Sequence, residues 1–123
     1  MKDFRHLEAD IAARYIGRPY VPGGRGPNGF DCVGLCLYVY GHELGLELDE
    51  LYSAGNKMRR MERPASMCIV DMRMPTGNSH AGLWLSSDGG GILHCIMPLG
   101  VIFSRLNGFD AIGTTIRGYY GVA

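Results

Sequence analysis

The chain has 123 residues, 46% of them hydrophobic, which suits one globular domain with its own core and leaves little length for a second. Twelve basic and twelve acidic side chains give no formal net charge. The charge balance therefore gives no support for nucleic acid or an anionic membrane as a partner. We expect a single domain over residues 1–123.

The first half of the chain predicts two helices separated by a loop. Apolar residues at helical spacing predict a helix over residues 4–16, capped by Asp3 and ended by Gly17. A loop rich in glycine and proline follows, over residues 17–29, and an apolar run then predicts a helix over residues 31–44, stopped at Gly45. Residues 46–63 are interpreted as a short helix or two turns.

Beyond Pro64 the pattern changes to the alternation typical of strands. The predicted strands cover residues 66–74, 78–86, 91–97, 101–106 and 114–122. The glycine-containing segment 86–90 is the predicted turn between the second and third strands. Helices first and strands later indicate an α+β domain, with the second helix packed on an antiparallel sheet of about five strands.

No apolar run approaches the length of about 18 residues that a membrane span needs, so no membrane insertion is expected. Residues 1–6 lack the apolar core of a secretory signal, which predicts synthesis in the cytoplasm without a signal peptide. The cysteines, at positions 32, 36, 68 and 95, are then expected to be reduced thiols. Zinc bound by the first two of them with His80 and His94 is an alternative, but their spacing lacks the usual knuckle geometry.

Cys32 is the strongest candidate for chemistry. It stands where the glycine-rich loop meets the apolar helix, in Gly29-Phe30-Asp31-Cys32-Val33-Gly34-Leu35. Free backbone N–H groups and the helix dipole favour a thiolate at a helix start. The other interpretation, a buried helix cysteine, is the one expected for Cys36, Cys68 and Cys95.

A nucleophilic cysteine needs a base and a group that orients the base. His80 and His94 lie on neighbouring predicted strands, fourteen residues apart. A turn centred near Ser87 puts them directly opposite on one face, and a register shift of two makes them diagonal neighbours on the same face. His94 also fits as a core histidine, in which case Asn78 or Asp71 orients His80.

Several stretches together resemble the NlpC family of papain-like cysteine peptidases, which cut cell-wall peptides. They are Gly17-Arg18-Pro19-Tyr20, Phe30-Asp31-Cys32-Val33-Gly34-Leu35, Ser79-His80-Ala81-Gly82-Leu83-Trp84-Leu85 and Leu93-His94. The resemblance runs from about residue 6 to the C-terminus. The short form is similar to the stand-alone peptidases of phage tails and gene-transfer-agent particles.

The resemblance implies a papain-like fold and a catalytic triad. Cys32 takes the position of the nucleophile, His80 that of the base and His94 that of the third, orienting residue. Tyr20 matches a tyrosine that the family associates with the oxyanion site, although a tyrosine closing the loop over the core fits as well.

The candidate substrate contacts are Asp31, Val33 and Trp84. Asp31 is equally suited to cap its helix, and Trp84 to fill the core. The family often has serine where this chain has Val33, and no Gly-Asp pair opens the first predicted strand in residues 64–71. These departures concern substrate specificity more than the triad.

The expected function is hydrolysis of peptidoglycan stem peptides through a thioester, without metal or cofactor, by a component of a phage or phage-like tail acting on the cell wall. Tail-tip proteins are the expected partners. The alternatives are a catalytically silent tail-assembly module, an amide or acyl transferase, and an injected antibacterial amidase. The basic cluster Lys57, Arg59, Arg60 and Arg63 is interpreted as a solvated face or a docking surface.

Overall fold

The computed structural model describes residues 2–48 and 58–122. Within them the helices are α1 (Glu8–Tyr15), α2 (Cys32–Glu43) and α3 (Leu106–Ala111), with 3-10 turns η1 (Arg5–Leu7) and η2 (Ser87–Gly89). The strands are β1 (Met58–Met61), β2 (Ile69–Arg73), β3 (Ser79–Leu85), β4 (Gly91–Ile96), β5 (Gly100–Ser104) and β6 (Thr115–Val122).

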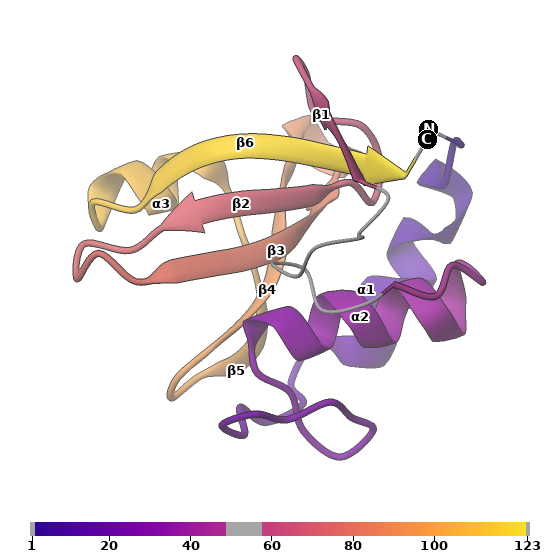
Figure 1. Cartoon of the computed structure of the whole chain (residues 1–123), viewed down its shortest axis with the longest axis horizontal. Coiled ribbons are helices and arrows are strands. Elements are labelled where there is room, and N and C mark those ends of the chain that lie inside the picture. The colour runs from indigo at the N-terminus through magenta and orange to yellow at the C-terminus, as the bar shows by residue number, and fades with distance from the viewer. Residues whose placement is uncertain (1, 49–57, 123) are drawn as a thin grey trace.

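These strands form one antiparallel sheet in the order β1-β6-β2-β3-β4-β5. Helices α1 and α2 lie together on one side of the sheet, and α3 lies away from them beside the start of β6 (Figure 1). The α+β architecture predicted from the sequence, with the second helix packed on an antiparallel sheet, is confirmed.

The sheet separates two apolar clusters, and β3 contributes to both. Ala81 and Leu83 belong to the cluster that contains Leu35 of α2, whereas Trp84 belongs to the cluster that contains Phe109 of α3. Because side chains alternate along a strand, His80 at the start of β3 shares the face of Trp84. The face that carries this histidine is therefore the one covered by α3.

Glu8 joins the helical layer to the sheet. Its carboxylate is 1% exposed and accepts hydrogen bonds from the hydroxyls of Ser66, Ser86 and Ser87 and from the backbone N–H groups of the last two. Burial alone would raise the pKa of this carboxyl, but the hydrogen bonds outweigh burial and lower it. Both carboxylate oxygens are thus hydrogen-bonded, and they link α1 to the residues just before β2 and just after β3.

The predicted helices and strands are present, and each is shorter than predicted. The N-terminal helix opens as the 3-10 turn η1 before α1, with Asp3 accepting from the N–H of Arg5, and Gly17, at φ +95°, ends it. The second helix begins at Cys32 and is followed by Gly45 at φ +68°. In both cases a left-handed residue terminates the helix, as glycine allows.

Two elements differ from the prediction. Residues 58–61, interpreted as helix or turn, form strand β1, because they pair with the end of β6. Helix α3 was not predicted: its Asn-Gly sequence is typical of a turn, and burial of Phe109 stabilises it. The rest of that interpretation, residues 49–57, lies outside the described residues.

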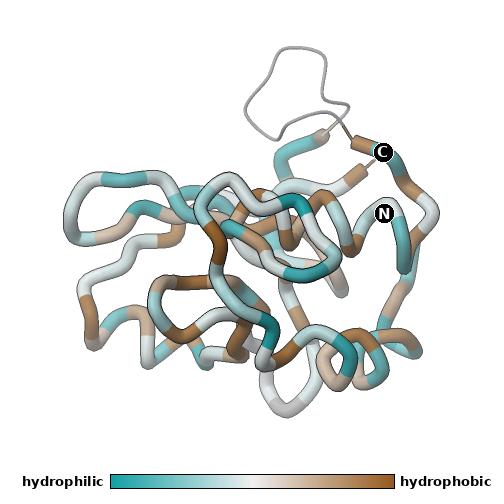
Figure 2. Tube along the Cα trace, turned by 90° about the horizontal axis from the view of Figure 1, so that it is seen from below, coloured by the Kyte–Doolittle hydropathy of each residue, from teal (hydrophilic) through white to brown (hydrophobic). Residues whose placement is uncertain are grey.

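Hydrophobic and hydrophilic residues are interspersed along the coloured part of the trace in Figure 2 instead of gathering in one segment. In the two described ranges, no helix has the length and apolar character needed to cross a bilayer.

Candidate active site

The loop before α2 packs closely on the first turn of that helix. The N–H of Asp31 donates to the carbonyl of Gly24 at 3.2 Å. A Cβ on Gly34 would overlap the same carbonyl oxygen, so the contact requires glycine at that position. This junction determines where Cys32 stands relative to the loop.

Asp31 caps α2, as one of its two predicted roles requires. Its Oδ1 accepts from the N–H of Gly34 at 2.6 Å and forms an ion pair with Arg25 at 2.7 Å. The carboxylate thereby holds both the helix start and the loop. Contact of Asp31 with substrate stays a prediction.

Cys32 is the first residue of α2 and is partly exposed, whereas Cys36, Cys68 and Cys95 are buried. This is the difference expected between a reactive thiol and core cysteines. The Cys32 sulfur accepts hydrogen bonds from backbone N–H groups, including that of Ala81 on β3. Ala81 follows His80 directly, so the Cys32 sulfur lies against the same end of β3 as the candidate base, with Ala81 and His80 on opposite faces of the strand.

The net pKa shift of Cys32 is opposite to the one expected from the helix start. Burial raises the pKa of the thiol, and the nearby Asp31 carboxylate adds to the increase. The N–H groups of Ala81 and Val33 oppose the shift without cancelling it. The N–H groups at the helix start favour the thiolate, as predicted, but burial outweighs them, so the neutral thiol is favoured and a base is needed to take its proton.

His80 and His94 meet as diagonal neighbours. The β3–β4 ladder pairs Gly82 with His94, so the turn is shifted by one residue from the assumed centre and His80 lies two residues beyond the partner of His94. Nε2 of His80 lies 2.8 Å from Nδ1 of His94, a hydrogen bond between the two rings. The alternative arrangement that the sequence allowed is the one present.

Gly82 makes room for this pair. A Cβ there would lie 2.9 Å from the carbonyl oxygen of Leu93 and 3.1 Å from Cβ of His94. The nearest obstacle is Cγ2 of Ile92 at 2.5 Å, so a side chain at Gly82 would first displace Ile92 and would crowd the backbone of the strand that carries His94.

Both rings are buried, with His80 5% and His94 2% exposed. The ring of Phe109 in α3 lies with its centroid 4.9 Å from that of His94. Burial lowers the pKa of both histidines well below the usual range, and the proximity of His80 lowers that of His94 further. Both rings are therefore neutral near pH 7.

The sequence did not single out Ser104, which is the next group in contact with this pair. Its Oγ lies 2.9 Å from Nε2 of His94, the nitrogen that His80 does not use. The available signal was a hydroxyl ten residues after the histidine on the next predicted strand, which is meaningful only once the register is known.

The other candidates for the orienting role lie elsewhere in the hydrogen-bond network. Asp71 accepts from Arg117 at 2.8 Å, and the same guanidinium donates to Ser79. Because His94 occupies Nε2 of His80, neither Asp71 nor Asn78 is the partner of that nitrogen.

Tyr20 lies beside the cysteine, whereas Trp84 does not. Tyr20 forms a β-bridge with Phe30, and burial together with the proximity of Cys32 raises the pKa of its hydroxyl. Trp84 is buried near the other end of β3, with its ring against Tyr119. Its contact with substrate stays a prediction, and its observed contacts are those of a core residue.

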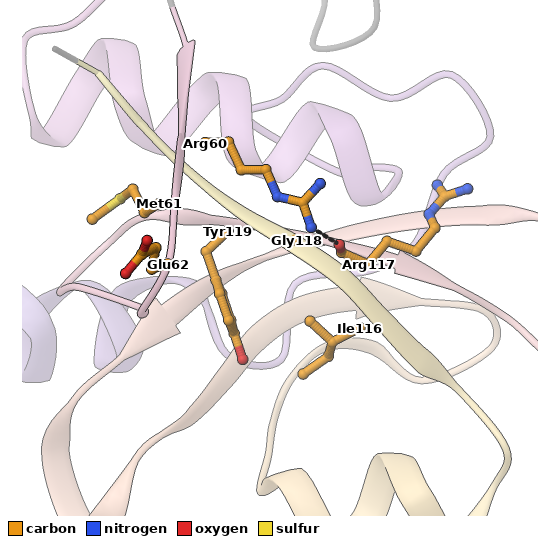
Figure 3. A pocket seen from close by; sticks show the side chains of 7 residues that line it. All are labelled: Arg60, Met61, Glu62, Ile116, Arg117, Gly118 and Tyr119. Atoms are coloured by element: carbon orange, nitrogen blue, oxygen red, sulfur yellow. Dashed lines mark hydrogen bonds between the residues drawn. The ribbon is translucent and has the colours of Figure 1, made fainter.

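A cavity of about 590 Å³ lies over β1 and β6, away from the predicted site. Figure 3 shows Arg60 reaching to the backbone carbonyl of Arg117 across it. The residues that line it are Arg60, Met61, Glu62, Ile116, Arg117, Gly118 and Tyr119. In the part of the chain that the structure describes, no three His, Cys, Asp or Glu side chains gather as metal ligands would.

Comparison with curated proteins finds several related sequences. Gamma-DL-glutamyl hydrolase of Bacillus subtilis (strain 168) is 38% identical over 79 residues, which are 59% of this chain and 19% of that protein. Protein P54 of Enterococcus faecium is 35% identical over 91 residues, 71% of this chain and 17% of that protein. Probable endopeptidase p60 of Listeria grayi is 29% identical over 102 residues, covering 79% and 19%. The chain spans about a fifth of the length of these relatives.

Solved structures share the fold at lower identity. The NlpC/p60 domain of peptidoglycan hydrolase SagA superposes with a TM-score of 0.68 at 24% identity, covering 96% of this chain and 97% of that one. NlpC2 of Trichomonas vaginalis gives a TM-score of 0.71 at 19% identity, covering 95% and 47%. Residues 17–109 match the family described as NlpC/P60, which is more than half of the chain. The chain therefore belongs to the NlpC/P60 family.

Proposed function

We propose that this chain is a cysteine peptidase that hydrolyses peptidoglycan stem peptides, with Cys32, His80 and His94 as its triad. The observation that carries the proposal is the 2.8 Å hydrogen bond between the two buried histidines at the end of β3 where the Cys32 sulfur contacts Ala81. A base oriented by a second group, with a partly exposed thiol at the same end of the strand, supports nucleophilic catalysis.

The first step is proton transfer from the Cys32 thiol. Nε2 of His80 is engaged by His94, so Nδ1 is the nitrogen left to accept the proton. Because burial disfavours both charged groups, the proton moves as the sulfur attacks the peptide carbonyl and forms the C–S bond.

The negative charge that develops on the carbonyl oxygen needs donors. The backbone N–H of Cys32 at the start of α2 and the hydroxyl of Tyr20 are the proposed pair. The raised pKa of Tyr20 keeps that hydroxyl protonated and able to donate. His80 then gives its proton to the leaving amine as the C–N bond breaks, and water hydrolyses the thioester with His80 again as base.

The proposed bond is a D-γ-glutamyl bond of the stem peptide. Relatives named gamma-DL-glutamyl hydrolase and probable endopeptidase support this substrate class. Residues 1–123 act as one catalytic domain in this proposal. Substrate contacts by Asp31, Val33 and Trp84 belong to it and are tested by single substitutions.

The proposed setting is a phage or phage-like tail, where tail-tip proteins hold the enzyme and it opens the cell wall locally. This setting rests on the resemblance to stand-alone peptidases of such particles. Mass spectrometry of purified particles tests it: absence of the chain from them contradicts the setting and leaves the peptidase activity untouched.

The activity is tested by incubating purified peptidoglycan with wild type, Cys32→Ala and His80→Ala and identifying the released peptides by mass spectrometry. Wild type is expected to release fragments, and both variants to lose at least about 1,000-fold in rate, since each removes an essential member of the triad. Cys68→Ala and His6→Ala are matched controls, because those side chains lie outside the site, and they are expected to retain activity.

Alkylation that favours one cysteine is the second measurement. Cys32 is expected to react with iodoacetamide faster than the three buried thiols, because it is the partly exposed one. No cleavage by wild type, together with a Cys32 that reacts no faster than the buried cysteines, contradicts the peptidase and leaves a silent structural module. Amide exchange with an added amine in place of hydrolysis identifies a transferase.

A further inference from the structure

Three polar side chains form a diagonal row across three neighbouring strands. His94 on β4 is directly opposite Gly82 on β3 and Ile102 on β5. His80 lies two residues from the first partner and Ser104 two residues from the second, on the same face of the sheet. The contacts along the row are 2.8 Å and 2.9 Å, each a hydrogen bond.

The two nitrogens of His94 are both engaged, which limits where its proton can lie. A neutral imidazole has one N–H and one lone pair. If His94 carries its hydrogen on Nε2, it donates to Ser104 and accepts from Nε2–H of His80. If it carries the hydrogen on Nδ1, it donates to His80, and His80 must then hold its own hydrogen on Nδ1.

Only the first arrangement suits a base at His80, because it leaves Nδ1 of His80 with a lone pair for the thiol proton. Once that proton arrives, both nitrogens of His80 carry hydrogens. His94 must then accept at Nδ1 and donate from Nε2, and the Ser104 oxygen is the acceptor it meets. Burial keeps His94 neutral, so it cannot escape this requirement by taking a second proton.

We propose that Ser104 is a positioning residue of the peptidase: its hydroxyl oxygen accepts the Nε2–H of His94 and holds that histidine in the tautomer that lets His80 act as base. The role rests on the proposed peptidase mechanism. Ser104 touches neither the thiol nor the reacting carbonyl in this scheme, and it acts through His94 alone.

Nitrogen NMR of the histidine rings tests the tautomer without reference to activity. The chain has four histidines, so substitution of each assigns the spectrum. Near pH 7 wild type is expected to show His80 and His94 both neutral and both protonated at Nε2. Ser104→Ala is expected to broaden or mix the His94 signals, and Ser104→Thr, which keeps the hydroxyl, to restore them.

Kinetics test the consequence for catalysis. Ser104→Ala leaves a buried N–H without an acceptor in the state with charged His80, so kcat is expected to fall on the order of tenfold with KM unchanged. Ser104→Thr is expected to recover most of kcat. Phe103→Leu is the matched control, because Phe103 neighbours Ser104 on β5 but packs in the other apolar cluster, and it is expected to keep kcat.

Two results overturn the proposal. One is a wild-type spectrum with His94 protonated at Nδ1. The other is Ser104→Ala with unchanged kcat and unchanged His94 signals. If wild type cleaves no peptidoglycan, the proposed function fails, and the NMR measurement still decides whether Ser104 sets the tautomer of His94.

Discussion

Burial favours the neutral form of both the Cys32 thiol and its proposed base. It raises the pKa of Cys32 and lowers that of His80, because each loses solvation of its charged form. Both shifts favour the neutral thiol and neutral imidazole over the separated charges. In the proposed mechanism the resting site therefore holds a neutral thiol and a neutral imidazole, and not a preformed thiolate.

This state predicts the acidic limb of the pH profile. The proposed mechanism needs neutral His80, and a lowered pKa means that the ring is protonated only at lower pH than an exposed histidine, whose pKa is about 6.5. Activity is expected to persist as pH falls below about 6, and to be lost well below that value. The measurement is kcat/KM on a stem peptide from about pH 4 to about pH 8. An acidic limb centred at or above about pH 6.5 contradicts the neutral pair.

At the scale of elements, α2 requires glycine at one position near its start and has no such requirement at another near its end. Gly34 lies under the carbonyl of Gly24, where a side chain would overlap backbone. Gly41 lies in the same helix, and a Cβ there would meet no atom within 4 Å. The same substitution at the two sites therefore separates loop packing from helix propensity.

Gly34→Ala is expected to displace the loop that carries Tyr20 and to reduce activity by more than about tenfold, since small misplacement of catalytic groups is costly. Gly41→Ala is expected to raise the free energy of unfolding by about 0.5–1 kcal/mol and to leave activity unchanged. Thermal unfolding and stem-peptide cleavage of both variants give the comparison. Equal activity in the two variants would show that the loop–helix contact does not position the site.

Elements determined by local sequence signals could be predicted, and elements determined by contacts with distant residues could not. The alternation in β2 to β6 and the cap at Asp31 are local signals, and the structure contains those elements. Strand β1 could not be predicted because Met58 and Met61 stand at helical spacing, and pairing with β6 overrides it. Helix α3 is short and weak by propensity, and its contact with the core stabilises it.

The site shows the same division. The sequence predicted Cys32 and the two histidines as site residues from motif and spacing, and it allowed for the diagonal register that the structure has. It could not identify Ser104, because a hydroxyl on β5 has meaning only when two ladders are fixed. It also could not weigh burial against the helix start at Cys32, because burial depends on what packs around the thiol.

At the scale of the whole molecule, Glu8 is the group whose charge connects the layers. Its carboxylate is buried and accepts hydrogen bonds from five donors of three serines near β2 and β3, namely three hydroxyls and two backbone N–H groups. The folded-state pKa is lowered, so the folded protein binds fewer protons at this group than the unfolded chain. Its contribution to stability is present above the unfolded pKa and is lost as pH falls through the folded pKa.

Glu8→Gln is expected to lower the free energy of unfolding at pH 7 by about 2–4 kcal/mol, because the amide presents hydrogens to serine donors in a buried cage. The free energy of unfolding of the variant is also expected to decrease less than that of wild type on acidification below about pH 5. Urea unfolding of both proteins from about pH 3 to about pH 7 measures this difference.

The matched control is Asp10→Asn, which changes an exposed carboxylate on the same helix. Its free energy of unfolding is expected to stay within about 0.5 kcal/mol of wild type. A parallel pH dependence in wild type and Glu8→Gln would contradict the assignment, because the acid sensitivity would then arise from other carboxylates, and the connection between the helices and the sheet would not depend on this charge.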